Sequence, residues 1–377
     1  MKILHIITDT NIGGAGKLLV AVLNNIDRET FDVCVALPRG SALLPLIEKT
    51  GTRVVLTEHG ADKSFESAAV RELCRIIKAE KPDAVHTHAS MSGRIAAKIA
   101  GVPIRTMTRH CAFPVKERNK RFPIKQIVGG ISDMLTTRYI ATALVARDEL
   151  IEMGCDEKKI TVIKNGSERV IRADKSKSDA LRATLGIPDG AFVAGISARL
   201  EEYKGHRYLI DAAALTCDEN VYYLIVGDGS EWENLRAYAK ERGVSDKVIF
   251  AGFASDVAPY YSIFDVALNC STGTETTPLG VTEPMSIGVP AIVSDYGGNT
   301  GIVESGRNGI VVPQRDADAL AGAILSLYGD RELLRKLGEG AKRSYDEEFS
   351  AGAMTKKLEK VYLSLEAEYE AENKKAR

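Results

Sequence analysis

Residues 271–299 have the sequence STGTETTPLGVTEPMSIGVPAIVSDYGGN. An apolar run at 265–270 precedes this stretch and predicts a buried strand, and residues 290–294 predict another. Between them, residues 279–287 predict a short helix, with Pro278 at its first position because the missing N–H is not needed there. This order of strand, loop, helix and strand predicts an α/β fold whose ligand-binding loop follows the carboxyl end of a parallel strand.

Two glutamates, Glu275 in the loop and Glu283 in the predicted helix, stand eight positions apart. The free backbone N–H groups at the helix start, near Gly280, favour an anion. A carboxylate on either side of that anion can accept hydrogen bonds from hydroxyl groups. A phosphate between two hydroxyl-binding carboxylates fits a nucleotide sugar. The alternative is that both glutamates are surface charges, which helix N-termini favour in any case.

The residues around the two glutamates resemble a known signature. The pattern E-x7-E, followed by a small residue, G-V-P, a strand and D-x-G-G, is similar to that of the retaining GT-B glycosyltransferases of family four. The resemblance implies an α/β chain of two Rossmann-like doubly wound domains that face each other across a cleft. It also implies transfer of a sugar from a nucleotide-diphosphate sugar, with a UDP-sugar as the expected donor, to a hydroxyl of a glycan, lipid-linked or small-molecule acceptor.

A second motif of the family lies at 198–206. Its sequence, ARLEEYKGH, resembles G-R-L-x-x-x-K-G with Ala198 in place of the first glycine. Arg199 and Lys204 stand five positions apart in this loop, so both can converge on one diphosphate. The resemblance and the residue types together imply that these residues of the second half bind the donor: Arg199, Lys204, Gly227, Phe253, Thr277, Pro278, Leu279, Gly280 and Glu283.

A glycine loop follows the first predicted strand, 2–8. It is not a P-loop, because Asn11 stands where that motif requires glycine. It is not a dinucleotide fingerprint either, because Leu19 stands where the third glycine is required, and this disfavours an NAD-dependent dehydrogenase. Gly13 and Gly14 remain as a permissive loop that lets the backbone approach a ligand. We therefore count both among the expected donor-binding residues.

Three histidines, His86, His88 and His110, lie at the ends of predicted strands. His86 and His88 are expected on opposite faces of one strand, and no acid or cysteine stands at ligand spacing from them, so a metal is disfavoured. His110 matches the acceptor-side histidine of the family, and the resemblance implies a catalytic role for His110 and Glu275. Neither a metal nor another cofactor is expected, because the only Asp-x-Asp triplet, 316–318, is predicted to cap a helix.

Without a metal, the leaving diphosphate requires another source of positive charge. Arg199, Lys204 and the helix start near Gly280 are expected to supply it. In relatives the acceptor hydroxyl is thought to arrive on the departing face, with a phosphate oxygen helping to take its proton, so Glu275 would position the sugar and not act as a nucleophile. A non-catalytic nucleotide-sugar-binding relative and a nucleotide-sugar 2-epimerase on the same fold are the alternatives. Residues 276–278, TTP, stand where relatives often carry G-F-P, which leaves the donor preference open.

Charge is distributed unevenly along the chain, although the net charge is −1. Lys and Arg outnumber Asp and Glu by 25 to 18 in residues 1–165, whereas Asp and Glu outnumber them by 33 to 25 in residues 166–377. The basic excess, with few aromatic residues and no recognisable binding motif, predicts no nucleic acid but an anionic acceptor or membrane surface. The residues expected on that side are Arg109, Lys116, Arg118, Lys120 and Arg121. A solvated charged loop is the alternative.

Length and composition predict an ordinary globular protein of two domains, with 377 residues of which 45% are apolar. We expect an acceptor-binding domain at 1–165, a donor-binding domain at 166–350, and a C-terminal helix at about 351–370 that packs back on the first domain. No apolar run approaches the length of a membrane span. Six scattered cysteines indicate reduced thiols. The expected location is the cytoplasm, with peripheral contact to the inner face of an anionic membrane.

Overall fold

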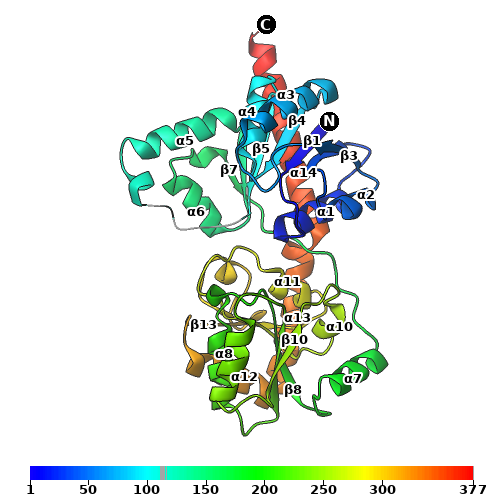
Figure 1. Cartoon of the computed structure of the whole chain (residues 1–377), viewed down its shortest axis with the longest axis vertical. Helices are drawn as coiled ribbons and strands as arrows, with labels where there is room; N and C mark the ends of the chain where they lie inside the picture. The colour runs from blue at the N-terminus through cyan, green and yellow to red at the C-terminus, as the bar shows by residue number, and fades with distance from the viewer. Residues whose placement is uncertain (111–114, 116, 377) are drawn as a thin grey trace. The chain divides into compact units, whose positions relative to one another are not determined.

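The structure is a computed structural model, and it describes residues 1–110, 115 and 117–376, without the side chains of Arg118, Asn119 and Ala376. The chain forms two compact units (Figure 1). Unit 1 comprises Met1–Gly166 and Ala351–Arg377, and unit 2 comprises Ser167–Ser350. Each unit has its own parallel sheet with apolar clusters packed against it, so each is a complete α/β unit.

The sheet of unit 1 has seven parallel strands in the order β3-β2-β1-β4-β5-β6-β7. The chain order reverses between β1 and β4, so these two neighbours form the switch point at which ligands bind in such sheets. His5 of β1 pairs in register with His86 of β4. The strands are β1 Lys2–Ile7, β2 Asp32–Pro38, β3 Arg53–Thr57, β4 Ala84–His88, β5 Ile104–Arg109, β6 Arg138–Ala141 and β7 Ile160–Val162.

Helices cover this sheet, and the last of them comes from the C-terminus of the chain. Helix α14 runs from Ala351 to Ala376 and packs against α1. Its Tyr362 contacts Phe31, which directly precedes β2, with ring centroids 5.9 Å apart. The backbone N–H of Asp27 donates to Glu359. The other helices are α1 Gly14–Asn25, α2 Leu44–Glu48, α3 Ser67–Glu80, α4 Met91–Ile99, η1 Glu117–Lys120, α5 Ile124–Leu135, α6 Leu144–Glu152 and η2 Glu157–Lys159.

The sheet of unit 2 has six parallel strands in the order β10-β9-β8-β11-β12-β13. They are β8 Phe192–Ser197, β9 Val221–Val226, β10 Val248–Gly252, β11 Val266–Asn269, β12 Ala291–Ser294 and β13 Gly309–Val312. The helical segments are α7 Lys175–Thr184, η3 Glu202–Lys204, α8 His206–Leu215, α9 Trp232–Glu241, α10 Ala258–Tyr261, α11 Leu279–Met285, η4 Asn299–Gly301, α12 Ala317–Gly329, α13 Arg331–Ser344 and η5 Tyr345–Phe349.

The predicted fold class is confirmed: the chain has two Rossmann-like parallel sheets. One detail of the predicted helix after Glu275 is wrong. Pro278 is the N-cap of α11 with extended backbone angles, φ −67° and ψ 120°, and the helix begins at Leu279. The prediction relied on the preference of proline for the first helical position, but Pro278 belongs to the end of the preceding loop. The cap predicted at 316–318 is confirmed, since the Asp316 carboxylate accepts from Ala319 N at 2.8 Å.

None of the helices in the described part of the chain is long and apolar enough to cross a bilayer.

Candidate functional site

Glu275 lies in the loop after β11, and its carboxylate is buried, with 4% of the residue exposed. Its Oε1 atom forms an ion pair with Lys204 Nζ and accepts from Ser271 Oγ at 2.6 Å and from Asn269 Nδ2 at 3.3 Å. The carboxylate is therefore not a surface charge, which was the alternative interpretation of the sequence. Among the described residues every hydrogen bond to the carboxylate reaches Oε1, and none of these bonds involves Oε2.

A second layer of polar side chains supports this arrangement. Asn299 Nδ2 donates to Asn269 Oδ1 at 3.2 Å and to Ser294 O at 3.1 Å. Ser294 Oγ donates to Ser271 O at 2.6 Å. Asn269 and Asn299 were not among the predicted site residues. Sequence signals for them were available, because Asn269 is an amide at the end of an otherwise apolar strand and Asn299 ends the D-x-G-G-N run.

The two glycines of the D-x-G-G pattern have a packing reason. Gly298 N donates to Glu275 O at 3.0 Å, and a Cβ on Gly298 would lie 1.6 Å from Thr276 O. Gly297 has φ +58° and also approaches Glu275 O, so a side chain there would be strained and obstructed. The pattern therefore encodes the close backbone approach that shapes the Glu275 loop.

Lys204 reaches Glu275 from the loop after β8. It ends η3 and is followed by Gly205 at φ +71°, where a Cβ would lie 2.0 Å from Cys270 O, so the Lys204 turn packs tightly on the residue that follows β11 and begins the Glu275 loop. Arg199 behaves differently. Its guanidinium is exposed and donates to Tyr203 Oη at 2.6 Å, so the structure pairs Lys204 but not Arg199 with the buried carboxylate.

Glu283 lies on α11, where Tyr261 Oη donates to its Oε2 at 2.8 Å. Tyr261 comes from α10 and is buried. Burial and the neighbouring Glu283 carboxylate raise the pKa of Tyr261 well above its ordinary value, so the phenol stays neutral and remains a donor. Tyr261 was not predicted to belong to the site, because no local pattern links it to a residue 22 positions away.

The other predicted donor residues of unit 2 follow strand ends or begin α11. Gly227 follows β9, and its N donates to Gly252 O at 2.8 Å. Phe253 follows β10 and is largely exposed. Leu279 and Gly280 form the start of α11, after the buried Thr277 and the N-cap Pro278. Because the strands are parallel, the predicted residues that follow their ends lie at one edge of the sheet.

In unit 1, Gly13 and Gly14 lie at the start of α1. Gly13 is the N-cap and Gly14 the first helical residue. A Cβ on either glycine would have no protein atom within 4 Å, so packing within the described chain does not require glycine at these positions. His110 follows β5, and its Nε2 lies 2.9 Å from His88 Nδ1. Burial lowers the pKa of His110 to about 4, so its ring is neutral at pH 7.

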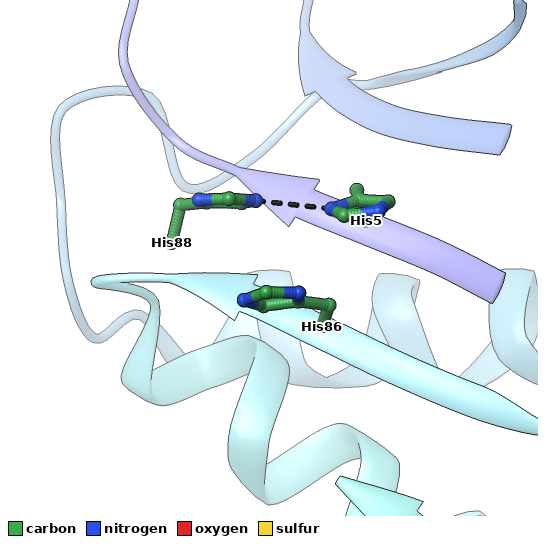
Figure 2. Close-up of side chains that lie close together, drawn as sticks. All are labelled: His5, His86 and His88. Atoms are coloured by element: carbon green, nitrogen blue, oxygen red, sulfur yellow. Dashed lines mark hydrogen bonds between the residues drawn. The ribbon is translucent and has the colours of Figure 1, made fainter. Parts of the chain in front are cut away.

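The expectation that His86 and His88 lie on opposite faces of their strand is wrong. Their rings stack with centroids 4.7 Å apart and an interplanar angle of 11°. Residues two apart in a strand share a face, because the side-chain period is two. Figure 2 shows the two rings on the same side of β4, with His5 of β1 beside them.

The predicted acceptor-side residues have different surroundings. Arg109 donates two hydrogen bonds to the buried Glu149, so its charge is neutralised inside unit 1. Lys120 pairs with Glu117 and Glu152, each at 3.2 Å. Arg121 is exposed. Lys116 and the side chain of Arg118 lie outside the described part of the structure.

Two family models match the chain, one over each half. The model described as Glycosyltransferase Family 4 matches residues 12–168, and the model described as Glycosyl transferases group 1 matches residues 177–344.

Individual proteins resemble the chain over part or nearly all of its length. It is 26% identical to UDP-Gal:alpha-D-GlcNAc-diphosphoundecaprenol alpha-1,3-galactosyltransferase of Escherichia coli, over 97% of each chain. It is 32% identical to the lipopolysaccharide core biosynthesis glycosyltransferase LpsE of Rhizobium meliloti (strain 1021), over 53% of this chain and 56% of that protein. Among solved structures, HepE of Anabaena in complex with UDP matches with a TM-score of 0.83 and 22% identity, over 97% of this chain and 100% of that one, which shows a shared fold.

Proposed function

We propose a reaction for this chain from the family to which it belongs: the chain is a member of the glycosyl transferases group 1 and of glycosyltransferase family 4, a family of retaining enzymes, and it has the GT-B fold. In the proposed reaction a sugar moves from a nucleotide-diphosphate sugar to an acceptor hydroxyl, with retention of configuration at the anomeric carbon. The proposed donor is a UDP-sugar, and no metal takes part.

The buried Glu275 is the observation that carries this proposal. Three donors hold Oε1, while Oε2 is left to a ligand, so the carboxylate has a fixed direction in which it can accept hydrogen bonds from sugar hydroxyls. A carboxylate already paired with Lys204 is a weak nucleophile, because its negative charge is neutralised. This supports a role for Glu275 in positioning the sugar.

Departure of the nucleoside diphosphate is the step that needs positive charge. Lys204 lies beside Glu275, and Arg199 lies five positions earlier in the same loop. We assign both to the diphosphate, together with the backbone N–H groups at the start of α11. In this proposal Lys204 exchanges part of its contact with Glu275 for a phosphate oxygen, and the phosphate oxygen takes the proton of the acceptor hydroxyl.

The proposed substrates rest on what related proteins use. HepE has been solved with UDP and with UDP-glucose, and the Escherichia coli relative is described as acting on a sugar linked to diphosphoundecaprenol. We therefore propose a UDP-sugar donor, bound by the carboxyl edge of the unit 2 sheet, and a lipid-linked glycan as the acceptor class. Donor binding by unit 2 and acceptor binding by unit 1 belong to the same proposal.

Donor binding gives the first test. Incubation with UDP or a UDP-sugar is expected to raise the melting temperature, because a ligand present at 100 times its dissociation constant and bound only to the folded state adds about 2.7 kcal/mol of stability. GDP, ADP and CMP serve as controls, each measured with and without EDTA. An increase that EDTA abolishes and Mg²⁺ restores would refute the metal-free mechanism. No increase with any nucleotide would favour a non-catalytic relative.

An exposed apolar face on α5 supports contact with a membrane. Ile124, Ile127, Ile131 and Met134 are exposed at spacings of three, four and three residues, which places them on one face of the helix. We call this set the α5 stripe. Phe122, 82% exposed, precedes it, and the basic residues beside it are Arg121 and Lys125, since Lys120 is paired with Glu117 and Glu152. An apolar face flanked by basic side chains fits the surface of an anionic bilayer.

A sedimentation experiment tests this contact. We expect the protein to sediment with vesicles that contain phosphatidylglycerol several-fold more than with phosphatidylcholine vesicles. The double substitution Ile127→Glu and Ile131→Glu should remove most of this binding, because two charges on the α5 stripe oppose its burial. Ile99→Glu, at another exposed apolar position of unit 1, is the control and should bind like the wild type. Equal sedimentation with both kinds of vesicle would contradict the proposal.

A further inference from the structure

Three histidines of unit 1 form a continuous hydrogen-bonded row, which we call the histidine chain: His5, His88 and His110. His5 Nδ1 lies 3.1 Å from His88 Nε2, and His88 Nδ1 lies 2.9 Å from His110 Nε2. Figure 2 shows the first of these contacts, with the rings of His5 and His88 edge to edge. The histidine chain runs from His5, in the middle of β1, past His88 at the end of β4, to His110, which follows β5.

The rings of the histidine chain are neutral at pH 7. His5 and His88 are buried, and burial together with the nearby Arg28 lowers the pKa of His5 to about 3. Burial and the neighbouring histidines lower the pKa of His88 well below its ordinary value. A neutral imidazole has one N–H and one bare nitrogen. Each contact therefore joins one N–H to one bare nitrogen, and all the protons must point the same way along the chain.

The surroundings of His5, at the other end of the histidine chain from His110, decide which way the shared protons point. His5 Nε2 is buried and has no hydrogen-bond partner in the described part of the chain. If the protons pointed toward His5, this atom would be a buried N–H without an acceptor, which is the rarer defect in proteins. If they point toward His110, His5 Nε2 is a bare nitrogen. The second arrangement makes His110 Nε2 an acceptor and places the proton of His110 on Nδ1.

We propose that His88 and His5 are positioning residues that hold His110 as its Nδ1–H tautomer, so that His110 donates a hydrogen bond to the substrate and does not act as a general base. This inference rests on the proposed function, which places His110 against the substrate. It agrees with a reaction in which a phosphate oxygen takes the proton of the acceptor, because His110 is then not required to accept one.

A metal site is the competing interpretation of these residues. His5, His86 and His88 offer ring nitrogens that all lie within 4.8 Å of one another. However, both nitrogens of His86 already have partners, Tyr362 Oη at 2.5 Å and Thr108 Oγ1 at 2.7 Å. The His86 ring also stacks on that of His88, and a metal in the plane of one stacked ring lies outside the plane of the other. The hydrogen-bonded arrangement therefore accounts for these contacts better than a metal does.

The tautomers can be observed directly by NMR. The chain has six histidines, so the full-length protein labelled with ¹⁵N-histidine gives few signals, and two-bond ¹H–¹⁵N correlations distinguish Nδ1–H from Nε2–H. His110→Gln and His88→Asn assign the two rings. We expect His110 as the Nδ1–H form in the wild type and as a mixture in His88→Asn. An Nε2–H form of His110 in the wild type, or the same tautomer in both proteins, would overturn the proposal.

Kinetics separate positioning from packing. His88→Asn is expected to lower kcat about tenfold or more with little change in the KM for the donor. His86→Asn is the matched control, because His86 is equally buried in the same layer but lies outside the histidine chain, so it should lower the melting temperature without changing the His110 tautomer. His59→Gln, at an exposed position, should change neither.

Two outcomes point elsewhere. A tightly held equivalent of Zn²⁺ that survives EDTA and removes the His5 and His88 N–H signals would replace the proposal with the metal site. If no donor supports transfer, the proposed function fails, whereas the tautomer measured by NMR still confirms or refutes the histidine chain.

Discussion

Glu275→Gln is expected to reduce glycosyl transfer on the order of 10³-fold while the chain keeps its fold. Glutamine has nearly the same shape as glutamate and can still accept from Ser271, so the loop geometry should survive. The substitution removes the negative charge that faces Lys204 and that orients the sugar in the proposed site. A lysine left without its partner also costs stability, about 1–3 kcal/mol for a largely buried group.

Initial rates with the donor found by thermal shift provide the measurement. Glu304→Gln is a suitable control, because Glu304 is an exposed glutamate of the same unit that pairs with Arg307 at the surface. It should transfer sugar like the wild type. Donor binding by Glu275→Gln should persist, because the diphosphate contacts assigned to Arg199 and Lys204 remain. Wild-type turnover in Glu275→Gln would refute the assignment of the site.

Acid is expected to destabilise unit 1 before carboxylates become protonated. His5, His86 and His88 are buried, and burial lowers the pKa of each, that of His5 to about 3, whereas in the unfolded chain they have their ordinary value near 6.5. Below pH 6.5 the unfolded state therefore binds more protons, so the free energy of unfolding falls as the pH falls. Each histidine contributes up to about 1.4 kcal/mol per pH unit. His110, whose pKa burial lowers to about 4, adds to this effect, so for these four histidines of unit 1 the slope approaches about 5 kcal/mol per pH unit near pH 5.

Urea denaturation at pH 7, 6 and 5 measures this slope, and the chain offers an internal comparison. Its single tryptophan, Trp232, lies in α9 of unit 2, where His206 is the one described histidine, with a pKa that burial lowers to about 4. Tryptophan fluorescence should therefore report a shallower pH dependence than circular dichroism of the whole chain. His5→Gln should lower the number of protons taken up on unfolding by about one, and so make the slope shallower, whereas the exposed His59→Gln should not. A stability independent of pH between 7 and 5 would contradict the expectation.

Local patterns in the sequence identified the family and the fold class. The alternation of apolar strands with helices predicts parallel α/β sheets, and E-x7-E with D-x-G-G is contained within a stretch of 29 residues. Such motifs are readable because each is formed by one strand, one loop and one helix. The errors were local as well. Pro278 caps α11 instead of starting it, and the side-chain period of two was misapplied to His86 and His88.

Only the tertiary structure decided which atoms these residues meet. Lys204 reaches Glu275 across 71 positions, Tyr261 reaches Glu283 across 22, and Asn299 supports Asn269 across 30. The histidine chain joins β1, β4 and the residue that follows β5 in the same way. The sequence determined the elements and the motif, because backbone periodicity and turns depend on neighbouring residues. Sheet order and register determined the contacts, because parallel strands bring residues from distant segments to one edge.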